Sequence, residues 1–278
     1  MKTDYYFINN DSRFINIAGD DRQDFLQGLI TNDVKVCNRN NPIYACILSP
    51  QGKFLADFFV IELDGSYLIE IHNQFFDNIF QKLQLYVLKS KVIITENNNY
   101  LSCVLFNNKI TVPNYLISFQ DPRKNNIGIK YILNTYNSSS FKKLGFTPVD
   151  INYYKEILMK NLIPYSPDDL IENKSLLLEN NFQNINALSW DKGCYVGQEI
   201  TARMKYRALL KKKIYTLEII SGSVQVGEKI TINDIPKGEI ISITKKFAIA
   251  MLKIDTANEV IKNDNVIDLS NATVKIIH

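Results

Sequence analysis

Cysteine and histidine are scarce in this chain, which has four cysteines and two histidines in 278 residues. The histidines are His72 and the terminal His278, and there is no C-x-x-C pair. The cysteines stand singly, at Cys37, Cys46, Cys103 and Cys194. Zinc knuckles and self-contained iron-sulfur sites use closely spaced cysteines, and Ser-His-Asp triads and Cys-His proteases need a histidine. The sequence favours none of these classes, and we expect no resident metal ion.

Long apolar runs and an excess of one charge are also missing. No run approaches the ~18 to 20 residues that cross a bilayer, because Asp57, Asp64 or Lys89 interrupts the longest candidates. Lys plus Arg number 32 and Asp plus Glu 29, which gives a net charge of +3. We therefore expect no membrane segment and no direct binding to nucleic acid.

The first residues show no targeting signal. Asp4 and Asp11 come early, and the segment has neither an apolar signal core nor the Arg-rich, acid-poor composition of a transit peptide. The expected location is therefore the cytoplasm.

What the chain does contain is a series of strongly patterned apolar segments, enough for two domains. In the first hundred residues their order is strand, helix, strands, helix, strand. This order predicts an α+β fold with a ferredoxin-like or split βαβ layer, in which two helices cover one face of an antiparallel sheet. The expected elements are a strand at 14–17, a helix capped by Asp20 or Asp21, strands at 43–48, 54–63 and 67–71, a helix capped by Asn73, and a strand at 91–95.

The second half of the chain has a different pattern of apolar segments. A helix is expected over 150–161, capped by Asp150 and ended before Pro164. From Lys213 onward, strand-sized runs alternate with glycine and proline, which predicts a small all-β barrel or sandwich. The expected strands lie at 214–220, 228–232, 239–244, 247–254 and 274–277. We place the domain boundary between 207 and 208, giving modules 1–207 and 208–278.

The densest unusual chemistry lies at 190–199, Trp-Asp-Lys-Gly-Cys-Tyr-Val-Gly-Gln-Glu, which holds the single tryptophan. Gly193 and Gly197 flank Cys194 and allow a loop that presents one side chain. If a helix begins at Gln198, its N-terminus and the charge of Lys192 favour a thiolate. The alternative is that Cys194 is a small buried residue in a glycine-rich turn.

The motif Lys192-Gly193-Cys194-Tyr195-x-Gly197-Gln198-Glu199 resembles the K-G-C-Y-x-G-Q-E signature of the folate-binding YgfZ family, whose fold is similar to that of the aminomethyltransferase (T-protein) of the glycine cleavage system. Other segments agree in order. They are the F-L-Q-G-x-x-T-N-D-V segment at 25–34, the P-Q-G-K turn at 50–53, Glu179-x-Asn181, and Ala202-Arg203.

This resemblance implies an aminomethyltransferase-like fold: two intertwined α+β subdomains, approximately 1–100 and 101–207, around a central cavity, followed by a C-terminal β-barrel. It also implies binding of tetrahydrofolate and support for the assembly or repair of iron-sulfur clusters. The implied partners are iron-sulfur client or assembly proteins, including radical enzymes that modify tRNA. In this reading Cys194 is the chemically active or transiently ligating residue.

A folate site needs a group that pairs with the pterin edge, an aromatic wall and basic residues for the glutamate tail. Glu179 is the candidate for the pterin edge with Asn181 in support, and Tyr154 is the candidate for the wall. A solvated acid at Glu179 and core packing of Tyr154 are the open alternatives. Lys192 and Arg203 are the expected basic groups, although a hydrated basic edge that includes Lys205 and Arg207 is equally open.

Asn32 and Asp33 are expected at the end of the first helix. Because an aspartate at a helix C-terminus opposes the helix dipole, we expect at least part of their role to be in the cavity. Plain helix-terminal and turn residues are the alternative.

The chain also departs from these relatives. Where the T-protein has two adjacent acids, only Asp57 is present, which weakens an assignment as a folate-dependent one-carbon transferase. The segment Ala208-Leu209-Leu210 lacks the glycine that follows an arginine in many relatives. A transferase and a folate-independent protein scaffold remain the alternatives to an iron-sulfur accessory factor.

Overall fold

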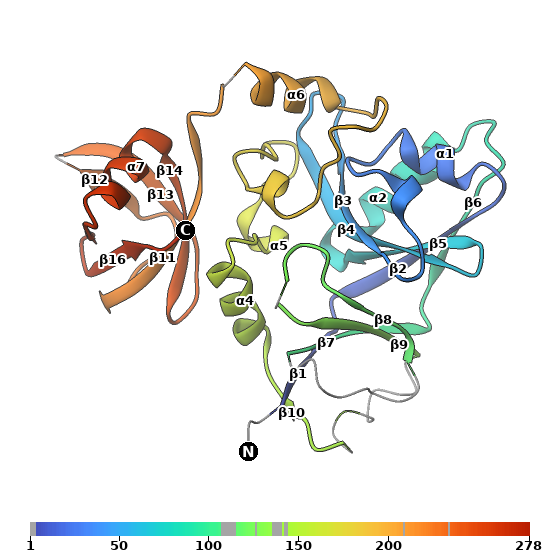
Figure 1. The fold of residues 1–278 in the computed structure, drawn as a ribbon, viewed down its shortest axis with the longest axis horizontal. Helices are drawn as coiled ribbons and strands as arrows, with labels where there is room; N and C mark the ends of the chain where they lie inside the picture. Colours follow the sequence, from blue (N-terminus) through green and yellow to red (C-terminus); the bar gives the residue numbers. More distant parts are fainter. Residues whose placement is uncertain are drawn as a thin grey trace.

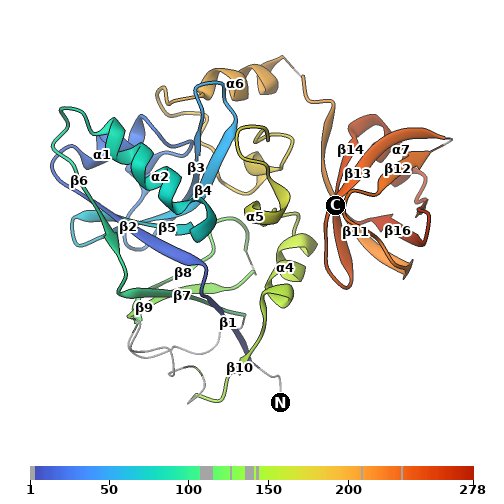
Figure 2. The ribbon, with the colours of Figure 1, turned by 180° about the vertical axis from the view of Figure 1, so that it is seen from behind.

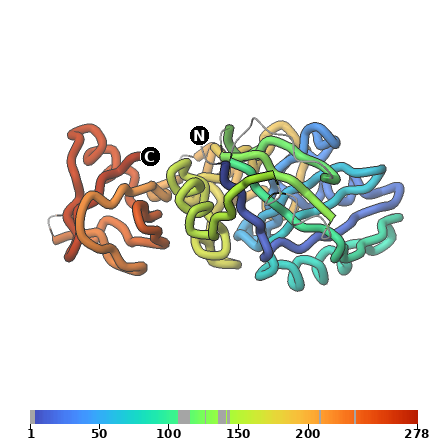
Figure 3. Tube along the Cα trace, turned by 90° about the horizontal axis from the view of Figure 1, so that it is seen from below, coloured from blue at the N-terminus to red at the C-terminus, as the bar shows by residue number. Residues whose placement is uncertain are grey.

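The structure is a computed structural model that describes residues 4–106, 115–125, 127–134, 141, 144–207, 209–232 and 234–278. Three sheets organise these residues, and a small barrel lies at one end of the molecule (Figures 1 and 3). Ala208, at the expected domain boundary, lies outside the described residues. No helix in the described ranges has the length and apolar character needed to cross a membrane.

The first sheet is the predicted split βαβ layer, with every neighbouring pair antiparallel. In sheet order its strands are β3 (Ile43–Leu48), β4 (Phe54–Leu63), β5 (Ser66–His72), β2 (Ser12–Ala18) and β6 (Ile93–Asn97). Its helices are α1 (Arg22–Gln27) and α2 (Asn73–Tyr86), and α2 packs against β2, β4 and β5 (Figure 2). The N-cap of α2 is His72, one residue before the expected Asn73, because the His72 ring nitrogen accepts from the Gln74 amide.

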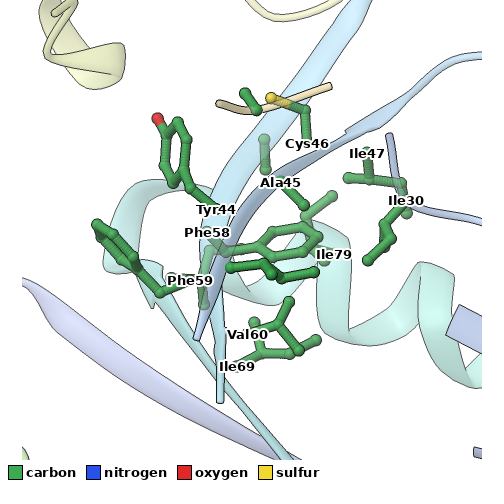
Figure 4. Packing of buried hydrophobic residues seen from close by; sticks show 14 of the residues in the cluster. Ile30, Tyr44, Ala45, Cys46, Ile47, Phe58, Phe59, Val60, Ile69 and Ile79 are labelled. Atoms are coloured by element: carbon green, nitrogen blue, oxygen red, sulfur yellow. The ribbon is translucent and has the colours of Figure 1, made fainter. Parts of the chain in front are cut away.

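Alternation along β4 separates the two faces of this sheet. Phe58 and Val60 lie on the side of Ile79 in α2, whereas Tyr44 and Phe59 lie on the other side (Figure 4). This period of two is that of a strand whose successive side chains point to opposite faces. Both faces are buried, so the run 54–63 is apolar at every position except Asp57 and Glu62. The face away from α2 carries the central cavity described below.

The second sheet joins the start of the chain to its middle. Its strands are β10 (Thr147–Pro148), β1 (Tyr5–Asn9), β7 (Tyr100–Leu105), β9 (Ile129–Asn134) and β8 (Tyr115–Gln120). β1 pairs antiparallel with β7. The chain therefore completes this sheet only after the first sheet has been built.

Helices and turns connect the second sheet to the barrel. The predicted Asp150 cap of α4 is confirmed, since its carboxylate accepts from the Tyr153 amide at 3.0 Å. α4 contacts both β1 and β14, so it lies at the junction with the barrel (Figure 3). The connecting elements are α4 (Ile151–Lys160), α5 (Ser166–Asp169), η3 (Phe182–Asn184) and α6 (Gln198–Tyr206).

The C-terminal module is a nearly closed, six-stranded antiparallel barrel with one helix. The helix, α7 (Ile254–Lys262), corrects the all-β expectation: it buries Ala257 and Val260 and contacts β14 and β16. In sheet order the strands are β12 (Lys229–Ile232), β13 (Ile235–Ile243), β14 (Phe247–Lys253), β11 (Lys212–Gly222), β16 (Ala272–Ile276) and β15 (Ile267–Asp268).

Candidate functional site

Cys194 is the accessible thiol of this protein. All four cysteines lie in the described part of the chain, and Cys194 is exposed whereas the other three are buried. Burial raises the pKa of Cys37 to about 11 and that of Cys46 well above the usual value of a thiol. Only Cys194 is therefore open to a partner in solution, and the reading of it as a buried turn residue is not supported.

The loop that carries Cys194 is anchored by Lys192. Its ammonium group donates hydrogen bonds to the carbonyl oxygens of Gln27, Ile30 and Asn32, each at 2.8 Å. Burial lowers the pKa of Lys192 to about 8, which leaves the group protonated at neutral pH. All three N–H groups are used by the turn after α1, so Lys192 has none left for a folate, and the structure gives it a structural role.

Two motif glycines bring the loop onto the first sheet. At Gly197 (φ +82°), an added Cβ would lie 2.5 Å from the Ser49 carbonyl oxygen and 3.2 Å from the Gly52 Cα. Gly52 (φ +69°) belongs to the turn between β3 and β4, and a Cβ there would lie 2.9 Å from the Gly197 oxygen. Both positions therefore require glycine for conformation and for space. The P-Q-G-K turn is thus the support on which the Cys194 loop rests.

Asn32 and Asp33 hold the turn after α1 together. The Asn32 amide donates to the Tyr44 and Asn186 carbonyls at 2.9 and 2.8 Å, and the Asp33 carboxylate accepts from the Lys35 amide at 3.0 Å. α1 ends at Gln27, so the expected position of Asn32 and Asp33 at its end is wrong. Asp33 instead caps the next helical turn, η1 (Val34–Val36). An acid at a helix N-terminus is favourable, which removes the reason for assigning it to a cavity.

Helix α6 presents a basic and aromatic surface beside Cys194. The Lys205 ammonium lies 3.7 Å from the centre of the Trp190 ring, and Tyr206 is 71% exposed. Arg203 pairs with Glu199 across one helical turn. A helix beginning at Gln198 is confirmed, and about half of its Arg203 side chain is exposed to solvent.

The central cavity lies on the face of the first sheet away from α2. It is small, about 60 Å³, and its lining includes Tyr44, Asp57, His72 and Tyr154. Burial raises the pKa of Asp57, although the Tyr44 hydroxyl donates a hydrogen bond to its carboxylate and acts in the opposite direction. Space of this size holds a few water molecules.

Buried charges fill the rest of that region. The Arg123 guanidinium donates to the Asp121 carboxylate and to the Tyr154 hydroxyl, both at 2.7 Å. Lys130 donates to Glu70 at 2.9 Å, in a pair that is almost fully buried. Tyr154 also stacks on Phe7, with ring centroids 5.1 Å apart. Tyr154 therefore lines the central cavity and also packs in the core, as the two alternatives from the sequence, a cavity wall and a core residue, each predicted.

Glu179 lies elsewhere, in a cleft of about 680 Å³ between α5 and the barrel. Its carboxylate is partly exposed, and Lys212 is 3.7 Å away. Asn181 does not share this cleft: its amide donates to the Leu162 carbonyl at 2.6 Å and its oxygen accepts from Asn184. Asn181 therefore holds its own turn, in a left-handed conformation at φ +66°.

The predicted residues thus fall in three places instead of one. Cys194 and Arg203 lie on the α6 surface, Tyr154 lines the central cavity, and Glu179 lines the interdomain cleft, while the others brace turns. Sequence reasoning missed the Arg123–Asp121 and Lys130–Glu70 pairs. Asp121 and Arg123 lie two residues apart in the turn after β8, but nothing in the sequence indicates that this turn is buried. Glu70 on β5 and Lys130 on β9 meet only because the first and second sheets pack together. Among the residues that the structure describes, no group of three His, Cys, Asp or Glu side chains is placed to hold a metal ion.

No protein-family model matches the chain. Curated relatives are iron-sulfur cluster assembly factors. The chain is 29% identical over 219 residues to the "Iron-sulfur cluster assembly factor IBA57 homolog, mitochondrial" of Mycosarcoma maydis, covering 73% of this chain and 54% of the relative. It is 28% identical to the homolog of Neurospora crassa, covering 73% and 51%, and 25% identical to the mouse factor, covering 74% and 63%.

Among solved structures, the fold is similar to that of the glycine cleavage system aminomethyltransferase T from Bartonella henselae. The TM-score is 0.76 at 9% sequence identity, and the match covers 99% of this chain and 85% of the other. The aminomethyltransferase-like fold, mixed α and β with a C-terminal barrel, is thereby confirmed. At this identity the likeness concerns the fold alone.

The expected cytoplasmic location is contradicted. Each of the relatives reported above is named as mitochondrial. The chain spans about half the length of the curated relatives it matches first. The composition of its first residues is therefore a poor guide to its compartment.

Proposed function

We propose that this protein is an accessory factor that supports the assembly or repair of iron-sulfur clusters in client enzymes, including radical enzymes that modify tRNA. The observation that carries the proposal is the exposed Cys194 on a loop braced by Lys192 and Gly197. The names of the relatives support the same class of function. In this proposal the cluster is cargo: Cys194 supplies one thiolate ligand, and the client or assembly protein supplies the others.

The test is complementation in a fungal strain that lacks its own relative of this protein. Cys194→Ser removes the soft ligand while keeping the size of the side chain, and we expect it to abolish recovery of cluster-dependent enzyme activity. Gly193→Ala is the matched control, because a Cβ at Gly193 meets no atom within 4 Å. Full recovery with Cys194→Ser would contradict the proposal.

Tetrahydrofolate is the proposed cofactor, and its fit differs between the two cavities. The central cavity of about 60 Å³ is too small for a pterin, since ligand sites normally measure about 300 to 1,000 Å³. The Glu179 cleft, at about 680 Å³, lies in that range. Glu179 would accept two N–H groups from the pterin edge there, and Ile241 and Met251, which are partly exposed, would provide apolar contact. A bound folate would supply a one-carbon carrier, while Glu179 orients it.

Calorimetric titration with tetrahydrofolate under anaerobic conditions tests this assignment. Glu179→Gln should weaken binding at least tenfold, because an amide donates where the pterin also donates. Glu218→Gln is the control, since Glu218 is exposed on the same strand as Lys212 but outside the cleft. Trp190 does not line the cleft, so its fluorescence reports on the α6 surface instead.

A one-carbon transferase is the second candidate, and Asp57 is its support. Asp57 is partly buried, accepts a hydrogen bond from the Tyr44 hydroxyl, and lines the central cavity. Transfer needs this acid beside a folate nitrogen, and the cavity has no room for one. Formation of methylene-tetrahydrofolate in vitro, lost in Asp57→Asn, would favour the transferase. Absence of any folate binding would favour a protein scaffold.

A further inference from the structure

The cleft that contains Glu179 has an apolar floor and a rim of lysines. The floor is built from the partly exposed barrel residues Ile241 and Met251, with Ile171 from the segment after α5. Five lysines line the same space, which we call the lysine-rimmed cleft: Lys174, Lys212, Lys229, Lys237 and Lys253. Such a surface suits a ligand with a flat apolar body and an extended anionic end.

The acids of the cleft are already engaged by other groups. Glu179 lies near Lys212, Glu239 pairs with Lys229, and Asp168 accepts from Lys155 at 2.6 Å. Asp169 is buried and accepts from the Tyr165 amide at 2.6 Å and from the Ser242 hydroxyl. Burial raises the pKa of Asp169 to about 6, so this carboxylate takes up a proton more readily than an ordinary aspartate.

Three lysines of the cleft are left without an acidic partner. In the described part of the chain, Lys174, Lys237 and Lys253 form no ion pair within 4.0 Å and no side-chain hydrogen bond. They come from the loop after α5, from β13 and from the end of β14, so the cleft gathers charge from both modules. An anion bound there would meet positive charge from more than one side.

The basic residues of α6 do not contribute to this cleft. Arg203 pairs with Glu199, and Lys205 lies over Trp190. None of these side chains lines the cleft. A tail held near Glu179 would therefore meet the cleft lysines and not the α6 surface.

We infer that Lys174, Lys237 and Lys253 make this site selective for folates with several γ-linked glutamates over folates with one. The inference rests on the proposed binding of folate beside Glu179. Each added glutamate brings one more carboxylate, and three free ammonium groups allow successive carboxylates to find a partner. The difference in affinity would come from contacts with the glutamate tail, whereas Glu179 and the apolar floor would bind the pterin equally in both ligands.

Calorimetry with monoglutamyl and pentaglutamyl tetrahydrofolate measures this selectivity. For the unmodified protein at low ionic strength we expect the pentaglutamate to bind about tenfold more tightly, with an advantage that shrinks as salt is added. In the triple variant Lys174→Gln, Lys237→Gln, Lys253→Gln the ratio should fall to about one, with monoglutamate affinity changed less than about twofold.

A matched triple variant, Lys245→Gln, Lys246→Gln, Lys262→Gln, changes three exposed barrel lysines outside the cleft and should keep the tenfold ratio. Equal affinity for the two folates in the unmodified protein would overturn this inference and leave folate binding intact. Binding of neither folate would overturn both. Tripolyphosphate that binds as tightly as the pentaglutamate would show a general polyanion site and overturn the selectivity for folate tails.

Discussion

The backbone of Gly197 rests directly on the backbone of Gly52, although the two residues lie 145 positions apart in the printed sequence. One belongs to the Cys194 loop and the other to the β3–β4 turn. The Val196 amide also donates to the Gly28 carbonyl at 3.1 Å, which ties the loop to the end of α1. Three motifs that are separate in sequence therefore form one support for the exposed thiol.

Gly197→Ala should destabilise the protein by about 1 to 3 kcal/mol, because its φ is +82° and the new Cβ meets backbone at 2.5 Å. Urea unfolding measures the change. Gly193→Ala, in the same loop but in open space, should stay within about 0.5 kcal/mol. Equal effects of the two substitutions would contradict the contact.

Lys192→Met should cost about 3 kcal/mol, since it leaves three carbonyl oxygens of the turn after α1 without their donor. Hydrogen exchange provides the local readout: the amides of Ser189 and Val196, which bond to the turn after α1, should lose protection. Lys35→Met removes an exposed lysine from the same region and should change neither quantity. Retained protection in Lys192→Met would show that the loop is held by other contacts.

Arg123→Met should destabilise by about 3 to 5 kcal/mol, because it leaves the buried Asp121 carboxylate without its counter-charge. Arg39, whose pair with Asp64 is exposed, is the comparison. Arg39→Met should cost about 0.5 kcal/mol or less. Thermal and urea unfolding of both variants measure the change in unfolding free energy. Similar decreases in the two variants would contradict the larger contribution of the buried pair.

The titration of Asp169 should make the unfolding free energy depend on pH. Burial raises its pKa from 3.8 to about 6, so the folded state binds the proton more tightly than the unfolded chain. The stabilisation is complete below about pH 3.8 and is lost as pH rises through about 6. Relative to Asp169→Asn, the unfolding free energy should fall by about 2 kcal/mol between pH 4 and pH 7. A flat difference would contradict the raised pKa.

Local patterns predicted the elements of the first sheet and helix α4 well, because apolar periodicity and capping residues act over a few positions. Asp150 caps α4 through a contact only three residues away. Helix α7 escaped prediction, since it begins directly after β14 and the apolar run continues into Ile254. The division at 207 and 208 and the reactivity of the Cys194 thiol stay predictions.

The site was less predictable than the fold, because motif order says nothing about distance. Glu179 and Tyr154 lie in the same predicted module, yet they line different cavities. The lysines at 174, 237 and 253 come from segments with no shared motif, so only the packing of the barrel against α5 brings them together. The charge of Lys192 suggested that it binds the folate tail. In the structure its ammonium group is buried and donates to three backbone carbonyl oxygens, so it stabilises a turn.

The pairing of β1 with β7 and β10 also affects how the protein is made. Residues 5–9 are synthesised well before their partners, which end at residues 105 and 148. Until β7 has been synthesised, a nascent chain therefore carries β1 as an unpaired apolar strand, a state that favours aggregation and engagement by chaperones. A cut after the first sheet would divide between two pieces the core clusters that contain Tyr6 and Phe7, and only the barrel core would stay whole.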